Sequence, residues 1–381
     1  MKKVKVLFLM PQMGMGGSER LVHNLVRRMD RSRFAPSLAW LYGAEALQEF
    51  QDLQVPLYYV PKTKRVDFSA MRKLANIIQT ESIDVVSAQH FMPAIYAYYG
   101  CNLVAKKSLV FTAHSRWEIE DTPLKWRVAG GYLLRRIGAS VGVSPDVSSA
   151  IQSVFRIKAS HIFTIENGVE IDLFSGEGNV GGLRSSLGLG DGDVVIGIVA
   201  NLKKVKNHLF LLQAFAKIAE EHDHVKLLVI GQGFPGEPDN TENDLRSYVN
   251  NHGFAERVSF LGFRADVAKL LRVVDVFCLT SLREGLPIGL IEAMATGLPV
   301  VGTNVEGIRD VIARNEDGIL VELGDVMALK DALTRLISDP EWRHKLGRTG
   351  REKAVQKYSL PRCVREYEQL FLSLANASAP R

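Results

Sequence analysis

The sequence has little cysteine and no long apolar run. Its three cysteines, Cys101, Cys278 and Cys363, are odd in number and far apart, which argues against a disulfide framework or a cysteine metal site. The apolar run VLFLM near the start ends before Pro11 and is shorter than the roughly 7–15 residues of a signal-peptide core. No stretch approaches the ~18 uninterrupted apolar residues of a membrane span. We therefore expect a cytoplasmic protein.

The length and composition predict two globular domains. At 381 residues the chain is too long for one compact core, and it fits two domains of roughly 150–200 residues. The hydrophobic content of 46% and the charged content of 23% are typical of a soluble globular enzyme.

Positive charge is concentrated in the first half of the chain. Residues 1–177 hold 22 Lys and Arg against 16 Asp and Glu, whereas the remainder holds 25 against 26. Two interpretations stay open: solvated helix faces, or attraction to an anionic membrane surface or substrate. The basic side chains that suggest a membrane are interleaved with apolar and aromatic ones, and the set comprises Lys62, Lys64, Arg65, Lys125, Arg127, Arg135 and Arg136 with Trp126, Tyr132 and Leu133.

Short apolar runs alternate with helix-like segments along the first half of the sequence. Such alternation predicts a parallel, doubly wound α/β sheet, with ligands at the carboxyl ends of the strands. The expected strands are residues 5–10, 35–42, 56–60, 84–89, 108–114, 139–144 and 161–167.

A glycine-rich segment, residues 167–193, interrupts this alternation and is typical of a linker. We predict one domain over residues 1–175, joined by a C-terminal helix in 360–381 that crosses back to it, and a second domain over 176–359. The second set of expected strands is residues 194–200, 225–231, 257–263, 273–280, 298–303 and 318–322.

The stretch EGLPIGLIEAMATGLPVVG, which begins at Glu284, follows one of these strands. Pro287 suits the first turn of a helix, so Glu284 lies in the preceding loop and Glu292 lies within the helix. Both carboxylates can then face one volume beside the free amides of Leu286 and Ile288. Amides at a helix start suit a diphosphate, and carboxylates suit sugar hydroxyls. The alternative makes Glu284 a turn residue and Glu292 a surface residue.

This stretch resembles the glutamate–seven residues–glutamate motif of retaining family 4 (group 1) glycosyltransferases. That family has the GT-B fold, in which two Rossmann-like domains face each other across a cleft. Further segments resemble family motifs in the family's order: GMGGSER (14–20), TAHS (112–115), ENGVEIDLF (166–174), ANLKKVKNHLFLLQAF (200–215) and VSFLGF (258–263).

The resemblance implies roles for particular residues. Lys206 would neutralise the donor phosphates, and His114 would contact the donor sugar near its reacting face. Glu284 would bind sugar hydroxyls, and Glu292 would bind the ribose. Catalysis is thus assigned to His114, Glu284 and Lys206. The remaining donor-binding residues implied are Gly16, Gly17, Asn201, Lys203, Phe263, Gly285, Leu286, Pro287 and Ile288.

Two positions depart from the family pattern. Asn201 occupies a slot where the family commonly has arginine, and Lys203 would supply the missing charge without a bidentate fork. Glu306 stands where many relatives have glycine and adds negative charge near the pocket.

The activity implied is transfer of a sugar, with retention, from a nucleotide-sugar to a glycan or lipid-linked acceptor in cell-surface polysaccharide, lipopolysaccharide or glycolipid biosynthesis. The first domain would hold the acceptor, and the second would bind the nucleotide-sugar. A UDP-sugar is favoured over a GDP-sugar, and we expect no metal, no cofactor and no nucleic-acid partner. Contact with an anionic membrane at its inner face is a further expectation. Two alternatives stay open: a nucleotide-sugar epimerase or hydrolase of the same fold, and a non-catalytic sugar-nucleotide-binding partner, which Asn201 favours.

Other patterns have simpler interpretations. GQGFPG (231–236) has dinucleotide-site spacing, but the residues that follow cannot open a helix. DGD (191–193) and HDH (222–224) read as turn and loop residues. His114 could simply satisfy backbone groups at a strand end, and the pair Arg135 and Arg136 is more typical of a solvated helix end than of a lipid-phosphate contact.

Overall fold

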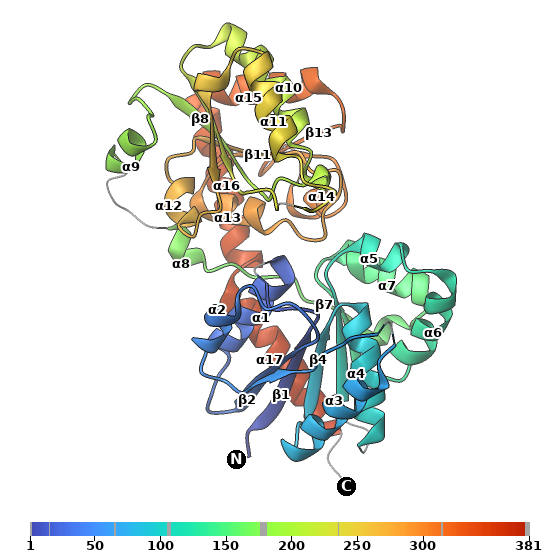
Figure 1. The fold of residues 1–381 in the computed structure, drawn as a ribbon. Coiled ribbons are helices and arrows are strands. Elements are labelled where there is room, and N and C mark those ends of the chain that lie inside the picture. The colour runs from blue at the N-terminus through green and yellow to red at the C-terminus, as the bar shows by residue number, and fades with distance from the viewer. Residues whose placement is uncertain are drawn as a thin grey trace. The chain divides into compact units, whose positions relative to one another are not determined.

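The computed structural model describes residues 2–14, 16–64, 66–104, 108–175, 181–234, 236–313 and 315–377. The chain divides into two compact units (Figure 1). The first comprises Met1–Gly168 and Leu360–Arg381, and the second comprises Val169–Ser359. Residue 176, where the linker pattern places the domain boundary, lies outside the described residues.

The first unit is built on a parallel sheet. Its described residues form seven strands in the order β3-β2-β1-β4-β5-β6-β7. The central strands are buried, as expected for a sheet covered on both faces. The strands are β1 (Val4–Met10), β2 (Phe34–Trp40), β3 (Leu57–Tyr59), β4 (Val85–Gln89), β5 (Ser108–Ala113), β6 (Ala139–Gly142) and β7 (Ile162–Thr164).

Helices connect these strands. They are α1 (Gly17–Arg28), α2 (Leu47–Gln51), α3 (Phe68–Thr80), α4 (Phe91–Leu103), α5 (Arg116–Glu120), α6 (Leu124–Leu134) and α7 (Pro145–Phe155), with a short 3₁₀ turn, η1 (Ala159–His161), before β7.

The C-terminal helix α17 (Leu360–Ala377) belongs to the first unit, as the sequence predicts. Its apolar face packs under the sheet, where Phe371 meets Phe8 edge-on with ring centroids 5.8 Å apart. Cys363 and Tyr367 are buried in the same cluster. Figure 1 shows α17 lying against β1 and β4.

The second unit contains a second parallel sheet. Its described residues form six strands in the order β10-β9-β8-β11-β12-β13. The strands are β8 (Val194–Val199), β9 (Val225–Ile230), β10 (Val258–Gly262), β11 (Val276–Leu279), β12 (Val300–Thr303) and β13 (Ile319–Val321). These two doubly wound units confirm the predicted fold class.

The helices of the second unit are α8 (Ile171–Phe174), α9 (Gly181–Ser186), α10 (His208–Glu221), α11 (Glu242–Asn251), α12 (Val267–Leu271), α13 (Ile288–Thr296), α14 (Ile308–Val311), α15 (Val326–Ser338) and α16 (Pro340–Lys357), with 3₁₀ turns η2 (Lys204–Lys206) and η3 (Ala255–Arg257). Within the described ranges, none of the helices in either unit combines the length and hydropathy of a bilayer-spanning segment.

Three short patterns lie where the sequence analysis placed them. The glycine stretch after β9 opens no helix, because α11 begins only at Glu242. Residues 191–193 form a turn before β8, and residues 222–224 connect α10 to β9.

Candidate functional site

In the second unit, the glutamate motif lies at the point where the strand order reverses. The first strand, β8, has β9 on one side and β11 on the other, so the loops after β8 and β11 leave the sheet side by side. Ligands of open α/β sheets bind at such switch points. The loop after β8 contains η2, and the loop after β11 leads into α13.

These two loops bring Lys206 and Glu284 together. The Lys206 ammonium lies 2.6 Å from Oε1 of Glu284, although the residues are 78 positions apart. The Glu284 side chain is only 7% exposed, and its Oε1 also accepts a 2.5 Å hydrogen bond from Ser281 Oγ. A buried carboxylate paired with a lysine is a strong, oriented interaction. The sequence predicted both residues for the site but not their direct ion pair.

Backbone contacts fix this arrangement. Thr280 Oγ1 donates to the carbonyl of Asn207 at 3.0 Å, and Leu282 N donates to the carbonyl of Val205 at 2.8 Å. Asn207 adopts φ +49°, a left-handed conformation that asparagine tolerates, and thereby turns the chain from η2 into α10. The lysine is therefore held on a loop that is anchored to the glutamate's own loop.

Helix α13 starts one residue later than the sequence indicated. Pro287 is the N-cap, and Ile288 is the first helical residue. Gly297 ends the helix at φ +86°, as expected of a glycine C-cap. Gly289 allows close packing on β8, because a Cβ there would lie 2.9 Å from the Val199 carbonyl. Glu292 is half-buried in the middle of this helix.

The neighbouring donor-site candidates have partners of their own. Lys203 pairs with Glu237 at 2.6 Å. The buried Oδ1 of Asn201 has no hydrogen-bond partner among the described residues. Glu306 pairs with Arg309 at 3.2 Å, which offsets the negative charge that it adds to its loop. Phe263 is 56% exposed at the carboxyl end of β10. Lys203 and Lys206 are thus each paired with one carboxylate at 2.6 Å, but only the partner of Lys206 belongs to the glutamate motif.

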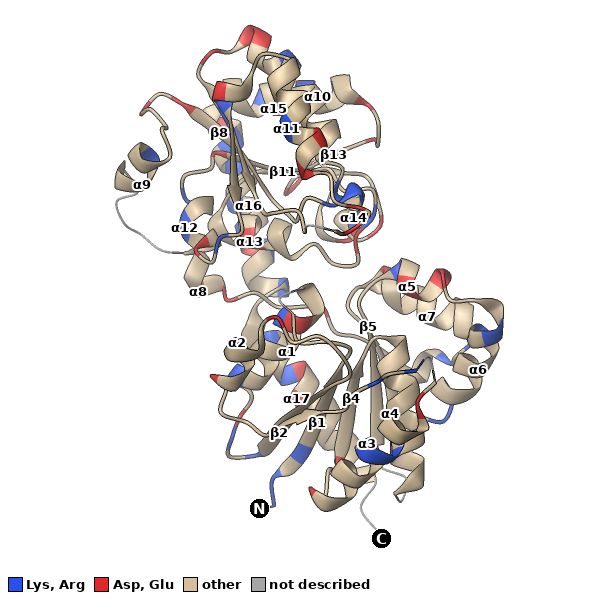
Figure 2. Cartoon of the chain, in the orientation of Figure 1, with Lys and Arg blue, Asp and Glu red and all other residues tan. Residues whose placement is uncertain are grey.

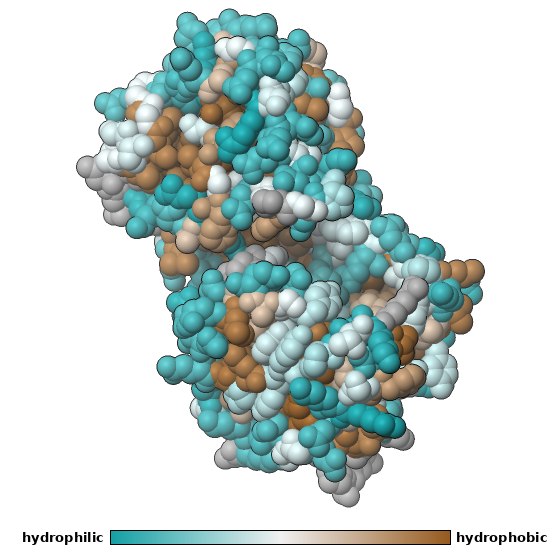
Figure 3. Space-filling model, viewed as in Figure 1, coloured by the Kyte–Doolittle hydropathy of each residue, from teal (hydrophilic) through white to brown (hydrophobic). Residues whose placement is uncertain are grey.

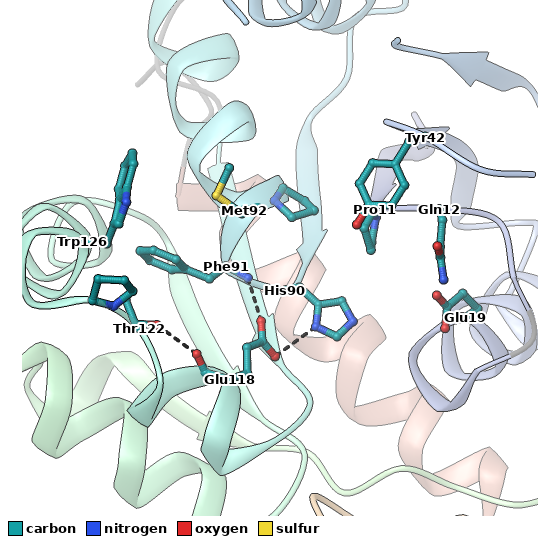
Figure 4. Close-up of a pocket in the computed structure, with 12 residues that line it drawn as sticks. Pro11, Gln12, Glu19, Tyr42, His90, Phe91, Met92, Glu118, Thr122 and Trp126 are labelled. Atoms are coloured by element: carbon teal, nitrogen blue, oxygen red, sulfur yellow. Dashed lines mark hydrogen bonds and ion pairs between the residues drawn. The ribbon is translucent and has the colours of Figure 1, made fainter. Parts of the chain in front are cut away.

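In the first unit, a pocket of about 520 Å³ lies at the corresponding switch point, where β1 and β4 are neighbours. Its lining comes from the loops that follow β1, β2, β4 and β5 and from the first turns of α1, α4, α5 and α6. Figure 4 shows His90 between two groups of lining residues: Phe91, Met92 and Trp126 on one side, and Pro11, Gln12, Glu19 and Tyr42 on the other.

Glu118 organises the floor of this pocket. Its Oε1 accepts from the amide of Phe91 at 2.8 Å, and its Oε2 lies 2.9 Å from Nδ1 of His90. The same Oε2 accepts a longer bond, 3.4 Å, from the amide of His114. One carboxylate thus ties the loop after β4 to the loop after β5.

His114, predicted for the donor site, lies beside His90, with ring centroids 4.7 Å apart. Its Nε2 lies 2.9 Å from Oε1 of Gln89, whose amide donates to Ser87. This network assigns the proton of His114 to Nε2 and leaves Nδ1 as an acceptor.

The two histidines have opposite pKa shifts. Burial and then the charge of His90 lower the pKa of His114 well below its usual value, so this ring is neutral. Burial alone would lower the pKa of His90, but the charge and hydrogen bond of Glu118 and the charge of Glu19 outweigh it and raise that pKa. A neutral imidazole and a more basic one are therefore adjacent.

His90 also has a strained backbone. It adopts φ +71° and ψ 162°, a region that residues other than glycine rarely enter. Such a conformation costs about 1–3 kcal/mol and persists where the surrounding structure imposes it, often at functional sites. His90 is the single residue between β4 and α4. Glu118 holds it in place through hydrogen bonds to the His90 ring and to the amide of the next residue, Phe91.

The glycine loop before α1 shapes another wall of the pocket. Glu19, in the first turn of α1, is only 5% exposed and accepts from Ser18 Oγ at 2.7 Å. A Cβ at Gly16 would lie 2.7 Å from Glu19 Oε2, so glycine leaves room for this carboxylate. A Cβ at Gly17, the first residue of α1, would meet nothing within 4 Å.

The sequence patterns did not point to Glu19, His90 or Glu118. A usable signal existed for His90, because it directly follows a buried strand, as His114 does. Glu19 lies within the GMGGSER motif, in which the resemblance assigns roles to the glycines only. Nothing in the sequence indicates that Glu118 would bind both histidine loops.

Comparison with solved structures identifies the class of fold. The Anabaena protein HepE in complex with UDP superposes with a TM-score of 0.88 at 20% identity, covering 97% of this chain and all of the other. This architecture is the GT-B fold of glycosyltransferases, as the resemblance implied.

Two family models match successive parts of the chain. The model described as Glycosyltransferase Family 4 matches residues 15–173, and the model described as Glycosyl transferases group 1 matches residues 182–353. The chain belongs to the group 1 glycosyltransferases of family 4.

Curated relatives extend over most of the chain. N-acetyl-alpha-D-glucosaminyl L-malate synthase of Bacillus anthracis is 27% identical over 84% of this chain and 83% of its own length. UDP-Gal:alpha-D-GlcNAc-diphosphoundecaprenol alpha-1,3-galactosyltransferase of Escherichia coli is 27% identical over 86% of each chain.

Proposed function

We propose that this glycosyltransferase moves a hexosyl group, with retention and without a metal, from a UDP-sugar to a lipid-linked glycan acceptor at the inner face of a membrane. The observation that supports this most directly is the pairing of Lys206 with buried Glu284 beside the start of α13. A cation, a carboxylate and helix amides there match the diphosphate and hydroxyls of one nucleotide-sugar.

Each donor-side residue has a role in this proposal. Lys206 leaves Glu284 to neutralise the leaving diphosphate, and the carboxylate then accepts from sugar hydroxyls. The amides of Gly285, Leu286 and Ile288, with Pro287 shaping the turn, bind phosphate or sugar oxygens. Glu292 binds the ribose, and Phe263 lines the base. Asn201 and Lys203 lie beside the phosphates in place of the usual arginine. Gly16 and Gly17 let the backbone approach the phosphates.

In the reaction, the bond between the sugar C1 and the phosphate oxygen breaks as the acceptor oxygen bonds to C1 on the same face. The acceptor proton passes to the departing phosphate, so no protein base is needed. Neutral His114 accepts a hydrogen bond from a donor-sugar hydroxyl through Nδ1, the nitrogen that its contact with Gln89 leaves unprotonated.

The choice of UDP rests on relatives. HepE was solved with UDP, and the Escherichia coli relative is named for UDP-Gal. The relatives differ in acceptor, since one makes a malate glycoside and the other acts on a diphosphoundecaprenol-linked sugar.

Helix α6 favours a lipid-linked acceptor. Leu124, Val128 and Tyr132, spaced four residues apart, are 76%, 70% and 55% exposed and form one apolar stripe, which we call the α6 ridge. Figure 3 shows apolar surface over this part of the first unit, and Figure 2 shows Lys and Arg around α6. Trp126 of the same helix lines the pocket, so one helix contributes to both the pocket and the ridge.

The side chains of α6 do not all serve a membrane contact. Arg135 donates to the carbonyls of Phe155 and Arg156, and Leu133 is buried. Arg136 lies over the Tyr132 ring at 3.5 Å. Lys125 is exposed beside the ridge, whereas Arg65 lies outside the described residues. The membrane contact that we propose therefore depends on the ridge and Lys125.

The test is nucleotide release from a panel of UDP- and GDP-sugars, with and without lipid-linked and soluble glycan acceptors. We expect release of UDP that depends on a lipid-linked acceptor, with the new glycosidic bond retaining the donor's configuration by NMR. Acceptor-independent release would indicate a hydrolase or epimerase. Donor binding without turnover on any acceptor would indicate a non-catalytic partner, which Asn201 in the slot of the usual arginine would then explain.

A further inference from the structure

The pocket of the first unit contains polar groups to which the donor-side roles assign no function. His90 and Glu19 both line it: His90 connects β4 to α4, and Glu19 lies in the first turn of α1, the helix that follows β1. Figure 4 shows the imidazole of His90 between Glu118 and Glu19. Glu118 is engaged by the Phe91 amide and the His90 ring, so Glu19 and the outer nitrogen of His90 are the groups that face a ligand.

Both groups are held rigidly. Nδ1 of His90 donates to Glu118 at 2.9 Å, which directs Nε2 away from this partner. The carboxylate of Glu19 is fixed by Ser18 and by the space that Gly16 leaves. Fixed polar groups in a concave site bind a ligand with little loss of side-chain freedom.

The remaining lining supplies apolar surface. Trp126 and Phe91 lie on one side of His90, and Tyr42 lies on the other. Pyranose rings have one apolar face of C–H groups that packs on aromatic rings, while their hydroxyls both donate and accept. The pocket volume of about 520 Å³ is sufficient for a monosaccharide unit.

We propose that this pocket binds the terminal sugar of the acceptor, and that Glu19 and His90 bind neighbouring hydroxyls and select an uncharged pyranose. A hydroxyl can donate to Glu19 and its neighbour can bond Nε2 of His90, as donor or acceptor. The assignment of the sugar as acceptor rests on the proposed function. The choice of an uncharged sugar rests on the pocket alone.

The charges of the pocket argue against an anionic terminal unit. Two carboxylates, Glu19 and Glu118, flank the single imidazole. A carboxylate or phosphate on the sugar would be brought next to Glu19 and partly desolvated, which is unfavourable between like charges. An anionic lipid diphosphate is compatible if it lies outside the pocket, near Lys125, which is exposed beside the α6 ridge.

The experiment measures binding of simple sugars to the full chain in the presence of UDP. The probes are the methyl α-glycosides of glucose, galactose and N-acetylglucosamine, compared with methyl glucuronide and glucose 6-phosphate, titrated by ligand-observed NMR. We expect at least one neutral glycoside to bind, and each charged sugar to bind at least about tenfold more weakly. UDP affinity is measured on the same samples by calorimetry.

Three variants locate the binding. Glu19→Gln should weaken the neutral glycoside about tenfold and also reduce the discrimination against the glucuronide, a change that a purely structural role would not produce. His90→Gln and Trp126→Ala should each weaken the neutral glycoside with UDP affinity unchanged. Glu49→Gln on α2 and Tyr99→Ala on α4 are controls at exposed positions outside the pocket. They should change neither glycoside binding nor UDP affinity. If Glu19→Gln does not fold, the other two pocket variants still decide.

The outcomes separate the two proposals. Any of three results would overturn this inference: no glycoside binding, equal binding of charged and neutral sugars, or unchanged binding in all three pocket variants. UDP binding by the same protein would still support the donor site. Glycoside binding that depends on Glu19 and His90, in a protein that binds no nucleotide, would instead support the pocket and reject the proposed function.

Discussion

At the scale of single residues, the charged side chains of the candidate donor site are paired with side chains of opposite charge. Lys206 and Glu284 are paired at 2.6 Å, whereas Lys203 is paired with Glu237, outside the glutamate motif. A charge paired inside the motif can exchange its partner for a ligand with little movement. This difference separates two lysines that look alike in the segment KKVK.

Replacement of Lys206 by alanine should therefore reduce turnover more than replacement of Lys203. We expect a loss of about 10²–10³ in kcat for Lys206→Ala, similar to removal of one stabiliser of developing charge. Lys203→Ala should lower kcat less than tenfold. Steady-state kinetics with a UDP-sugar gives both values, and equal small losses would mean that helix amides alone hold the phosphates.

Glu292 provides the matching prediction for the nucleoside. Glu292→Ala should weaken UDP binding by about 1–3 kcal/mol, the cost of a lost charge-assisted hydrogen bond. Calorimetric titration with UDP measures this, and Glu352→Ala on α16 is a control on another helix of the same unit. Unchanged UDP affinity would remove Glu292 from the donor site.

The strained backbone of His90 predicts an unusual order of stability. Glycine normally destabilises a site by about 0.5–1 kcal/mol relative to alanine. At φ +71° and ψ 162° glycine should be the better residue, so His90→Gly should unfold at a higher denaturant concentration than His90→Ala. Chemical denaturation of the two variants measures the difference. Neither variant has the imidazole, so the comparison isolates the backbone, and an alanine variant as stable as the glycine one would contradict the strain.

At the scale of secondary-structure elements, short loops after strands position the side chains of the candidate sites. The connection from β4 to α4 is His90 alone, and α13 starts directly after the loop that holds Glu284. Tight packing then fixes these helices. In α6, a Cβ at Gly130 would lie 2.7 Å from the rings of Phe91 and Phe155, and a Cβ at Gly131 would lie 2.7 Å from the carbonyl oxygen of Phe155.

The close approach of α6 and α7 predicts the effect of a single methyl group. Gly131→Ala should destabilise the first unit by about 1–3 kcal/mol, because the obstructing atom belongs to the backbone and cannot rotate away. Gly182→Ala in α9 is the control, since a Cβ there meets nothing within 4 Å. Thermal and chemical denaturation give the values, and a neutral Gly131→Ala would show that α6 shifts freely against α7.

At the scale of the whole molecule, the proposed membrane contact combines the basic excess of residues 1–177 with the α6 ridge. Exposed apolar side chains insert at a bilayer interface, and each nearby basic residue adds about 1 kcal/mol at an anionic surface. Charge alone would give a contact that salt abolishes, whereas the ridge adds a part that salt leaves intact.

Binding to vesicles should show both components. The protein should co-sediment with vesicles containing phosphatidylglycerol at low salt, and weaken as ionic strength rises, because charges are screened within about 10 Å at 0.1 M. The double variant Leu124→Ser, Val128→Ser should lose binding at all salt concentrations, while Lys125→Glu should lose it mainly at low salt. Indifference of the wild-type protein to anionic vesicles would favour a soluble acceptor.

The sequence by itself determined the architecture of this protein and the positions of several candidate site residues. Alternating apolar runs and helical segments specify two parallel sheets, because strand and helix periodicities are local properties that neighbouring residues encode. The ordered motifs likewise placed Lys206, Glu284 and His114 at the carboxyl ends of strands, where the structure has them.

Only the tertiary structure decided which of these side chains meet. The pairing of Lys206 with Glu284 spans 78 positions and depends on β8 lying next to β11, a strand order that periodicity does not encode. Arg135 looked like a free surface cation in the sequence, but packing directs it to the carbonyls of α7's last turn. The strain at His90 and its contact with Glu118 arise in the same way, because they exist only where segments distant in the chain are packed together.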